Sequence, residues 1–138
     1  MNGAVFFLLF FAVSLFAESE GERLFKSNNP AAAIPLLERE LSSGTLSSAA
    51  YNYLGLSYYQ TGQYDKSVAV FEKGLSVPGT DKKVLAYNAG HSAFAAGNYT
   101  KADSCYSLAL SASPDFAKAL LNRANARLNQ MQLEGALG

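Results

Sequence analysis

One pattern of hydrophobic, small and polar positions occurs twice between residues 48 and 115. In both copies, small and aromatic residues recur at helical spacing and are interrupted once by a short glycine-containing turn. Three pairs of landmarks lie 35 residues apart: Gly55 and Gly90, Gly62 and Gly97, and Tyr64 and Tyr99. A period of this length is typical of a solenoid built from stacked repeats.

Each copy predicts two antiparallel helices. Gly55 and Gly90 lie inside the first helix, where glycine costs about 0.8–1 kcal/mol relative to alanine. We expect the close approach of a neighbouring helix backbone to offset that cost. Gly62 and Gly97 each precede a tyrosine by two residues and fit the left-handed residue that ends a helix. The second helix of each hairpin therefore begins near Tyr64 or Tyr99.

These residues resemble the tetratricopeptide repeat, a helix-turn-helix unit of about 34 residues. Tyr51-x2-Leu54-Gly55-x2-Tyr58 is similar to its W-x2-L-G-x2-Y start, and Ala102-x3-Tyr106 with Pro114 to its A-x3-F and closing proline. Ser67 departs from the usual alanine, and Ala86 from the usual aromatic residue. The structural signature comprises Tyr51, Leu54, Gly55, Tyr58, Gly62, Tyr64, Phe71, Gly90, Gly97, Tyr99, Ala102, Tyr106 and Pro114. The resemblance implies an all-α fold of antiparallel helical hairpins, stacked as a right-handed solenoid.

The first 17 residues read as a signal peptide. The apolar run from Ala4 to Phe16 is too short for a membrane-spanning helix, which needs roughly 20 residues. We expect cleavage after Ala17; an uncleaved anchor in the inner membrane is the alternative, and a buried core helix is a weaker one. Together with the family resemblance, this segment predicts an exported, periplasmic protein of the bacterial envelope that meets a membrane only if the leader stays attached.

Residues 18–138 are predicted to form the repeat domain. Its parts are a degenerate repeat at about 18–46, complete repeats at 48–80 and 83–115, and a partial repeat or capping helix at 117–138. Pro35 is expected to kink its helix or delay its start. Met131 replaces the turn glycine of the last unit, and Leu133 and Ala136 occupy the places of Tyr99 and Ala102, so the sequence reaches only one turn into what would be a second helix; we expect three hairpins and a capping helix. The preceding segment, up to Gln130, is polar enough to suggest a solvent-facing cap.

The composition of the chain argues against several classes of function. The chain has 11 Lys and Arg residues against 11 Asp and Glu, with a sequence pI near 6.6. It has no basic cluster, so we expect no nucleic-acid partner. His91 is the only histidine and Cys105 the only cysteine, which leaves no set of metal ligands and no redox pair. We therefore expect no metal, no cofactor and no enzyme activity.

Cys105 and His91 are expected on opposite sides of one hairpin, so a catalytic thiol–imidazole pair is not predicted. Cys105 reads as a partly buried small side chain, with an intermolecular disulfide as the alternative. His91 reads as an exposed residue of a binding groove, with a structural histidine, or less favourably a metal ligand, as the alternatives.

In the resembling family, the first helices of the hairpins line a concave groove that binds another protein. Helical spacing then assigns to the groove Asn52, Leu56, Tyr59, Tyr87, His91, Phe94, Lys118, Leu121 and Asn125, together with Leu128. An aromatic, amide-rich groove suits a partner's helix or extended peptide. Two alternatives stay open. Tyr59, Phe94 and Leu128 could pack between repeats, or Tyr59, Tyr87 and Phe94 could hold an apolar small ligand in a tunnel.

Some members of the family grip a C-terminal carboxylate with Lys and Asn side chains on successive first helices. Asn88 and Lys118 occupy two of those positions, but Asn52, Leu56 and Asn122 replace the other residues, so this clamp is not predicted. Self-association through the C-terminal helix is a further prediction, because Leu133 and Leu137 are expected to be uncovered.

Overall fold

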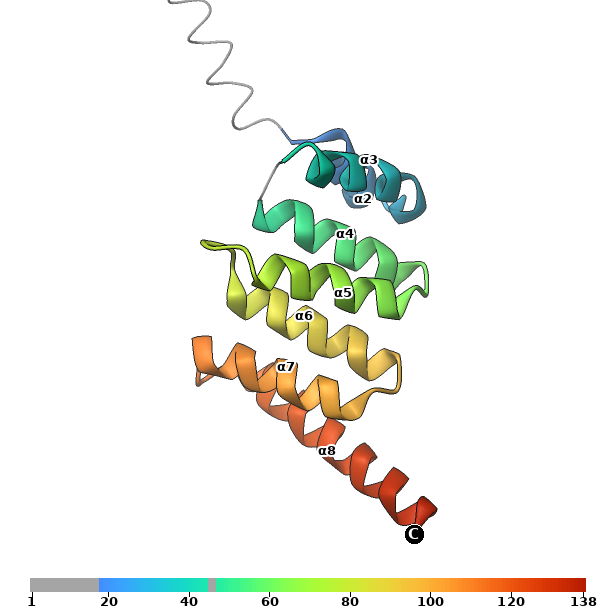
Figure 1. The fold of residues 1–138 in the computed structure, drawn as a ribbon, viewed down its shortest axis with the longest axis vertical. Helices are drawn as coiled ribbons and strands as arrows, with labels where there is room; N and C mark the ends of the chain where they lie inside the picture. The colour runs from blue at the N-terminus through green and yellow to red at the C-terminus, as the bar shows by residue number, and fades with distance from the viewer. Residues whose placement is uncertain (1–17, 45–46) are drawn as a thin grey trace, which may run out of the picture.

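The computed structural model describes residues 18–44 and 47–138, and this part of the chain forms seven α-helices (Figure 1). The helices are α2 (Glu20–Lys26), α3 (Pro30–Ser42), α4 (Ser48–Gln60), α5 (Tyr64–Leu75), α6 (Lys82–Ala95), α7 (Tyr99–Ala112) and α8 (Ala117–Leu137). The prediction of an all-helical fold built from sequential hairpins is confirmed. The predicted leader, residues 1–17, lies outside the described residues.

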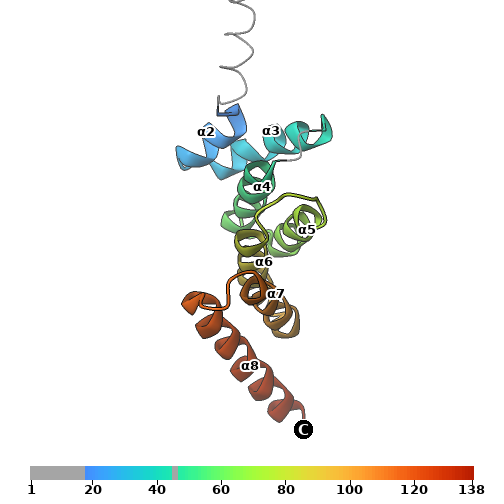
Figure 2. The ribbon, with the colours of Figure 1, turned by 90° about the vertical axis from the view of Figure 1, so that its left-hand side faces the viewer.

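The hairpins α2–α3, α4–α5 and α6–α7 follow one another along the long axis of the molecule, and α8 packs against the last of them (Figures 1 and 2). Each second helix also packs against the first helix of the next hairpin. The first helices touch in succession, from α2 to α4, α4 to α6 and α6 to α8. They therefore form one continuous layer, here called the first-helix surface. No helix within the described ranges has the length and apolar character needed to cross a membrane.

The turn inside each hairpin uses a left-handed residue at the same repeat position. Its φ is 77° at Gly62 and 80° at Gly97, where glycine carries no steric penalty. Asn28 occupies this position in the first hairpin with φ 63°, a conformation that asparagine tolerates better than most residues. In the second hairpin, the amide of Gln63 then donates to the carbonyl of Tyr58 at 2.8 Å, which closes the helix end.

A glycine in each first helix faces a large side chain of its own second helix. A Cβ added at Gly55 would lie 2.5 Å from Cε1 of Phe71, and one at Gly90 would lie 2.7 Å from Cδ1 of Tyr106. Gly21 stands against Leu37 in the same way. The sequence reasoning expected a helix backbone to approach these glycines, but the nearest atoms belong to side chains. Glycine is required because any side chain would overlap that ring or branched chain.

The core runs through the hairpins as successive clusters rather than as one centre. Buried side chains of one hairpin meet those of the next, as where Tyr51 and Phe71 pack with Leu85, Ala89 and Cys105. At the end of the stack, α8 contributes only the small side chains of Ala119 and Ala126 to the buried set.

Two helix boundaries differ from the expectation; a kink at Pro35, the other expectation for that residue, stays a prediction. Helix α3 begins at Pro30 and continues through Pro35, so its start is not delayed. Pro30 occupies a first-turn position that needs no N–H donor, and the Asn29 side chain accepts from the Ala32 amide at 3.4 Å, which fixes the start. Helix α8 also continues through Met131 to Leu137 instead of turning. Met131 favours helix and disfavours the left-handed conformation that a glycine provides there.

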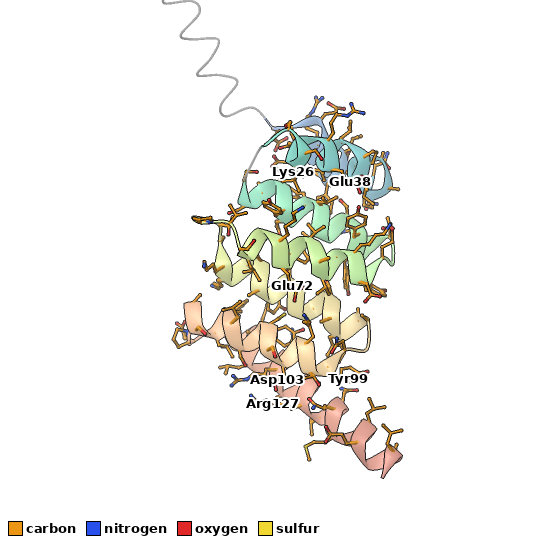
Figure 3. All side chains as sticks on the ribbon, in the orientation of Figure 1. Lys26, Glu38, Glu72, Tyr99, Asp103 and Arg127 are labelled. Carbon is orange, nitrogen blue, oxygen red and sulfur yellow. The ribbon has the colours of Figure 1, made fainter. Side chains whose placement is uncertain are left out.

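The predicted capping helix stays a prediction, but the outer side of α8 is not uniformly polar. Two of its arginines reach toward α7: Arg127 Nε donates to Asp103 Oδ2 at 3.0 Å (Figure 3), and Arg123 Nη1 donates to Ser107 Oγ at 3.2 Å. The side chains left on the other side include exposed leucines. Arginine is long enough to reach across to α7, whereas Ala119 and Ala126 allow the two helices to pack closely.

Candidate functional site

Four rings form a row across the first-helix surface, from α4 through α6 to the start of α8. The ring centroids of Tyr59 and His91 lie 5.3 Å apart, those of His91 and Tyr87 6.2 Å apart, and those of Tyr87 and Phe116 4.9 Å apart. We call Tyr59, His91, Tyr87 and Phe116 the aromatic row. Such spacings allow favourable ring–ring contact, so the row links three first-helix segments.

Side-chain amides connect the same helices. Asn88 Nδ2 on α6 donates to Asn52 Oδ1 on α4 at 2.7 Å. Asn122 Nδ2 on α8 donates to the Tyr87 hydroxyl at 3.0 Å. Each bond joins adjacent first helices, and the residues involved are only partly buried. The surface therefore offers amide and hydroxyl groups beside aromatic rings.

The structure separates the predicted groove residues by exposure. Four of them are exposed: His91, Lys118, Leu121 and Asn125. The others are partly buried: Asn52, Leu56, Tyr59, Tyr87 and Phe94. Leu56 packs against the core cluster that contains Tyr51 and Phe71, so its side chain is largely structural. The direct contacts described above bring together Tyr59, His91 and Tyr87, whereas Asn52 contacts Asn88.

Tyr59 and Phe94 occupy equivalent positions and have equivalent neighbours. Tyr59 lies 5.4 Å from Tyr64, and Phe94 lies 5.1 Å from Tyr99, measured between ring centroids. In each pair, the end of a first helix is joined to the start of its second helix. Both contacts lie within one hairpin, so they do not decide the alternative in which these side chains pack between repeats. Tyr59 additionally contacts His91 of the next hairpin, so it belongs to both the core edge and the surface.

Phe116 is the member of the aromatic row that sequence reasoning missed. It caps the start of α8, outside the helical spacing used to select groove residues. The ammonium nitrogen of Lys83 lies 4.6 Å from the centroid of its ring, within cation–π range. The sequence signal that could have identified Phe116 is its position directly after Asp115, immediately before the expected start of a helix.

Cys105 and His91 do not form a reactive pair. Cys105 is buried against Tyr51, Phe71 and Leu85, whereas His91 is exposed between Tyr59 and Tyr87. Burial, assisted by the nearby Glu72 carboxylate and opposed by the Lys101 ammonium group, raises the pKa of the Cys105 thiol from 9.0 to about 11. The thiol therefore stays protonated near neutral pH and is a poor nucleophile. Within the described ranges, no three acidic, His or Cys residues are grouped to hold a metal ion.

A hollow of about 650 Å³ lies beside α5 and α7, lined by residues that include Leu75, Cys105 and Leu108. The ion pair between Lys101 Nζ and Glu72 Oε1, at 2.6 Å, joins the two helices at this hollow. The side chains of Lys101 and Glu72 are 40% and 43% exposed, so solvent screens the interaction and it contributes little to stability. Leu108 is 43% exposed and lies outside the first-helix surface.

Comparison with known proteins identifies the repeat. The sequence model described as "Tetratricopeptide repeat" matches residues 19–79 and 87–138. RNA polymerase II-associated protein 3 of Xenopus tropicalis is 32% identical over 82 residues, which are 59% of this chain and 12% of that protein. This chain thus spans only a small part of that relative.

Solved structures agree on the fold. The crystal structure of MamA superposes with a TM-score of 0.73 at 20% identity, over 85% of this chain and 63% of that one. The TPR2AB domain of yeast Sti1, in a complex with pHSP90, gives a TM-score of 0.70 at 18% identity, over 86% and 47% of the two chains. These likenesses extend to the fold alone. With the sequence match covering most of its residues, the chain belongs to the tetratricopeptide repeat family.

Proposed function

We propose that this protein is a non-enzymatic adaptor that binds a helix or an extended peptide of another protein on its first-helix surface. Tetratricopeptide repeat domains are in general protein-interaction modules, and the Sti1 structure includes a bound pHSP90 partner. The observation that carries the proposal is the aromatic row with exposed His91 at its centre. Rings and amides on a rigid helical layer are suited to binding a polypeptide.

The amide pair suits a peptide backbone. In the described structure Asn88 donates to Asn52, which leaves the Asn52 amide hydrogens and the Asn88 oxygen available for further bonds. A peptide group offers one acceptor and one donor, so one backbone unit of a partner can bond to both side chains. Aromatic rings beside the pair would cover the apolar side chains of the same segment.

The rings themselves argue against the alternative of an apolar small ligand. The ring centroid of Tyr87 lies 4.9 Å from that of Phe116 and 5.9 Å from that of Tyr106, so these rings occupy the space between the helices instead of enclosing a tunnel. Phe94 packs on Tyr99 in the same manner. A small ligand held by Tyr59, Tyr87 and Phe94 would need these contacts to open, whereas a peptide can lie across them.

We also propose that the protein is exported and acts as a scaffold in the bacterial envelope. The support is the apolar run from Ala4 to Phe16, which has the length of a signal-peptide core and is followed by Ala17 and Glu18. Intact-mass measurement of the protein made from the full sequence would test this proposal. A chain starting at Glu18 in the periplasmic fraction supports export, an uncut chain in the inner membrane supports the anchor, and an uncut chain in the cytoplasm contradicts both.

The binding proposal is tested by affinity capture from envelope extracts with three forms of the protein. The wild type should retain a protein partner. Tyr59→Ser/His91→Ala should lose that partner, and Leu108→Ala, whose exposed side chain lies outside the first-helix surface, should keep it. Far-UV circular dichroism confirms that each variant is folded. Equal retention by all three forms would contradict the proposed surface, and a co-purifying small molecule that raises the melting temperature would favour the ligand alternative.

A further inference from the structure

A hollow of about 490 Å³ lies where α3 and α5 flank α4. No member of the aromatic row lines it, so it is separate from the proposed binding surface. All three helices contribute to its apolar wall: Leu41 and Val70 are partly buried, and Leu54 is only 3% exposed. A concave site of this volume with an apolar wall can hold a small organic molecule.

Two side chains of opposite charge line this hollow from different helices. Glu38 comes from α3 (Figure 3) and Lys73 from α5. Within residues 18–44 and 47–138, neither side chain forms an ion pair. Opposite charges that line one apolar hollow without meeting are complementary to a ligand that carries both charges itself.

A buried tyrosine holds the acidic group of the hollow. The Glu38 carboxylate accepts a hydrogen bond from the Tyr58 hydroxyl. Burial, together with the bond to this carboxylate, raises the pKa of Tyr58 to about 12, so the phenol stays protonated at neutral pH and continues to donate. A carboxylate has about four acceptor sites, so one bond orients the group and leaves acceptor sites for a cation.

The hollow between α5 and α7 shows the neutralised form of the same arrangement. There Glu72 pairs with Lys101 at 2.6 Å. Glu38 lies 34 residues before Glu72 and holds the same repeat position. Lys66 lies 35 residues before Lys101 and holds the position of that lysine. Lys66 is not paired with Glu38, however, because it lies over the Tyr58 ring, 5.8 Å from the centroid.

Tyr58 accounts for the difference between the two hollows. Its counterpart 35 residues later is Ala93, a buried side chain with no polar atom. Glu72 therefore pairs directly with its lysine, whereas the Tyr58 phenol holds Glu38 and its ring holds the equivalent lysine. The hollow beside α3 consequently keeps a negative and a positive group available for a ligand.

We propose that this hollow binds a free α-amino acid with an apolar side chain. The α-ammonium group of the ligand donates to Glu38, and its α-carboxylate accepts from Lys73. The ligand's side chain lies against Leu41, Leu54 and Val70. An amine or a fatty acid would satisfy only one of the two charged groups, whereas an amino acid carries both charges next to its apolar part.

Isothermal titration calorimetry with L-leucine, on the protein made from the full sequence, tests the proposal. The wild type should bind one leucine per chain with a Kd of about 1 mM or below. Isoamylamine and isocaproate have the same alkyl chain but only the ammonium or only the carboxylate group. Each should bind about tenfold more weakly or worse, because it leaves one charged side chain of the hollow without a partner.

Substitutions assign the two ends of the ligand. Glu38→Gln and Lys73→Gln should each weaken leucine binding about tenfold, and both side chains are exposed, so the fold should persist. Glu38→Gln should also stop discriminating leucine from isocaproate, a change that a purely structural role of Glu38 does not produce. Glu72→Gln is the matched control: it removes the equivalent acid from the neutralised hollow and should bind leucine as the wild type does.

The proposal does not rest on peptide binding at the first-helix surface, and the two can fail separately. Tyr59→Ser/His91→Ala should bind leucine normally. A small molecule that co-purifies with the wild type and is lost in Glu38→Gln belongs to this hollow. No binding at about 10 mM leucine would overturn the proposal. So would a wild type that binds isoamylamine or isocaproate as tightly as leucine, a comparison that needs no variant.

Discussion

The hydroxyl oxygens of Ser67 and Ser92 lie 2.7 Å apart in the core between the second and third hairpins. Ser67 Oγ is also 2.7 Å from the Gly55 carbonyl oxygen, and Ser92 Oγ is 3.0 Å from that of Asn88. Two hydroxyl protons are therefore shared among three short contacts. The two serines join α4, α5 and α6, but two protons cannot make hydrogen bonds in all three contacts at the same time.

Ser67→Ala should consequently change stability by no more than about 1 kcal/mol. Ser92 keeps the Asn88 carbonyl as its acceptor, and alanine is the residue that the family usually has at this position. Ser67→Val is the contrasting variant: its extra methyl groups enter a fully buried site and should cost about 1–3 kcal/mol. Urea unfolding of the three proteins measures both values. A loss above 2 kcal/mol for Ser67→Ala would show that the hydroxyl is essential.

Gly55→Ala should destabilise the protein by about 1–3 kcal/mol, although alanine favours helix by about 1 kcal/mol. The new methyl group would overlap the Phe71 ring, which is fully buried and cannot move into solvent. Gly135→Ala is the matched control, because nothing lies within 4 Å of its added Cβ, and this change should stabilise α8 slightly. Trimming the ring in Gly55→Ala/Phe71→Leu should recover part of the loss. Greater stability for Gly55→Ala alone would disprove the overlap.

Phe71→Ala should cost roughly 3 to 5 kcal/mol, because it removes a large, fully buried side chain from the centre of a core cluster. Leu108→Ala, in the next second helix, removes a side chain that is 43% exposed and should cost much less. Equilibrium unfolding in urea gives both values. A loss below 1 kcal/mol for Phe71→Ala would contradict the assigned core.

The Cys105 thiol should react slowly in the folded protein. Its pKa is raised from 9.0 to about 11, so at pH 8 the thiolate is about 100-fold less abundant than in the unfolded chain. Iodoacetamide labelling followed by mass measurement, with and without urea, checks this difference. Equal labelling rates under the two conditions would show that the thiol is not buried as described.

The same shift predicts a pH dependence of stability. Between pH 9 and 11 the unfolded chain loses the thiol proton while the folded chain keeps it, so stability is full below pH 9 and falls as the pH rises through about 11. Cys105→Ala removes this contribution. The difference in unfolding free energy between wild type and Cys105→Ala should therefore change over this pH range, and a constant difference would contradict the shift.

The repeat could be recognised from sequence because local rules determine it. Two of these rules apply within one hairpin: glycine takes the left-handed turn position, and small residues face large ones. The third is the constant repeat period from one hairpin to the next. Asn28 shows the limit of this reasoning, since it fills the position of Gly62 and Gly97 with a different residue. The sequence could not show which atoms face Gly55, because residue spacing alone does not distinguish a neighbouring helix backbone from an aromatic side chain.

The candidate surface was only partly predictable. Helical spacing selected Tyr59, Tyr87 and His91, which do come together, but it omitted Phe116, which lies outside a regular helix. The end of the chain was the least predictable part. Repeat symmetry required a turn at Met131, whereas helix propensity and the missing glycine extended α8 instead. The polar residues of α8 suggest a polar cap only when the side of the helix that each residue occupies is left out of account.

Site-specific photo-crosslinking in cells tests the central claim most directly. A benzophenone side chain at position 91 stands at the centre of the aromatic row, and one at position 108 stands on an exposed site outside the first-helix surface. The adaptor account predicts a protein adduct from position 91 that disappears with Tyr59→Ser, and no such adduct from position 108. An adduct from position 108 alone, or one from position 91 that survives Tyr59→Ser unchanged, would contradict binding on the first-helix surface.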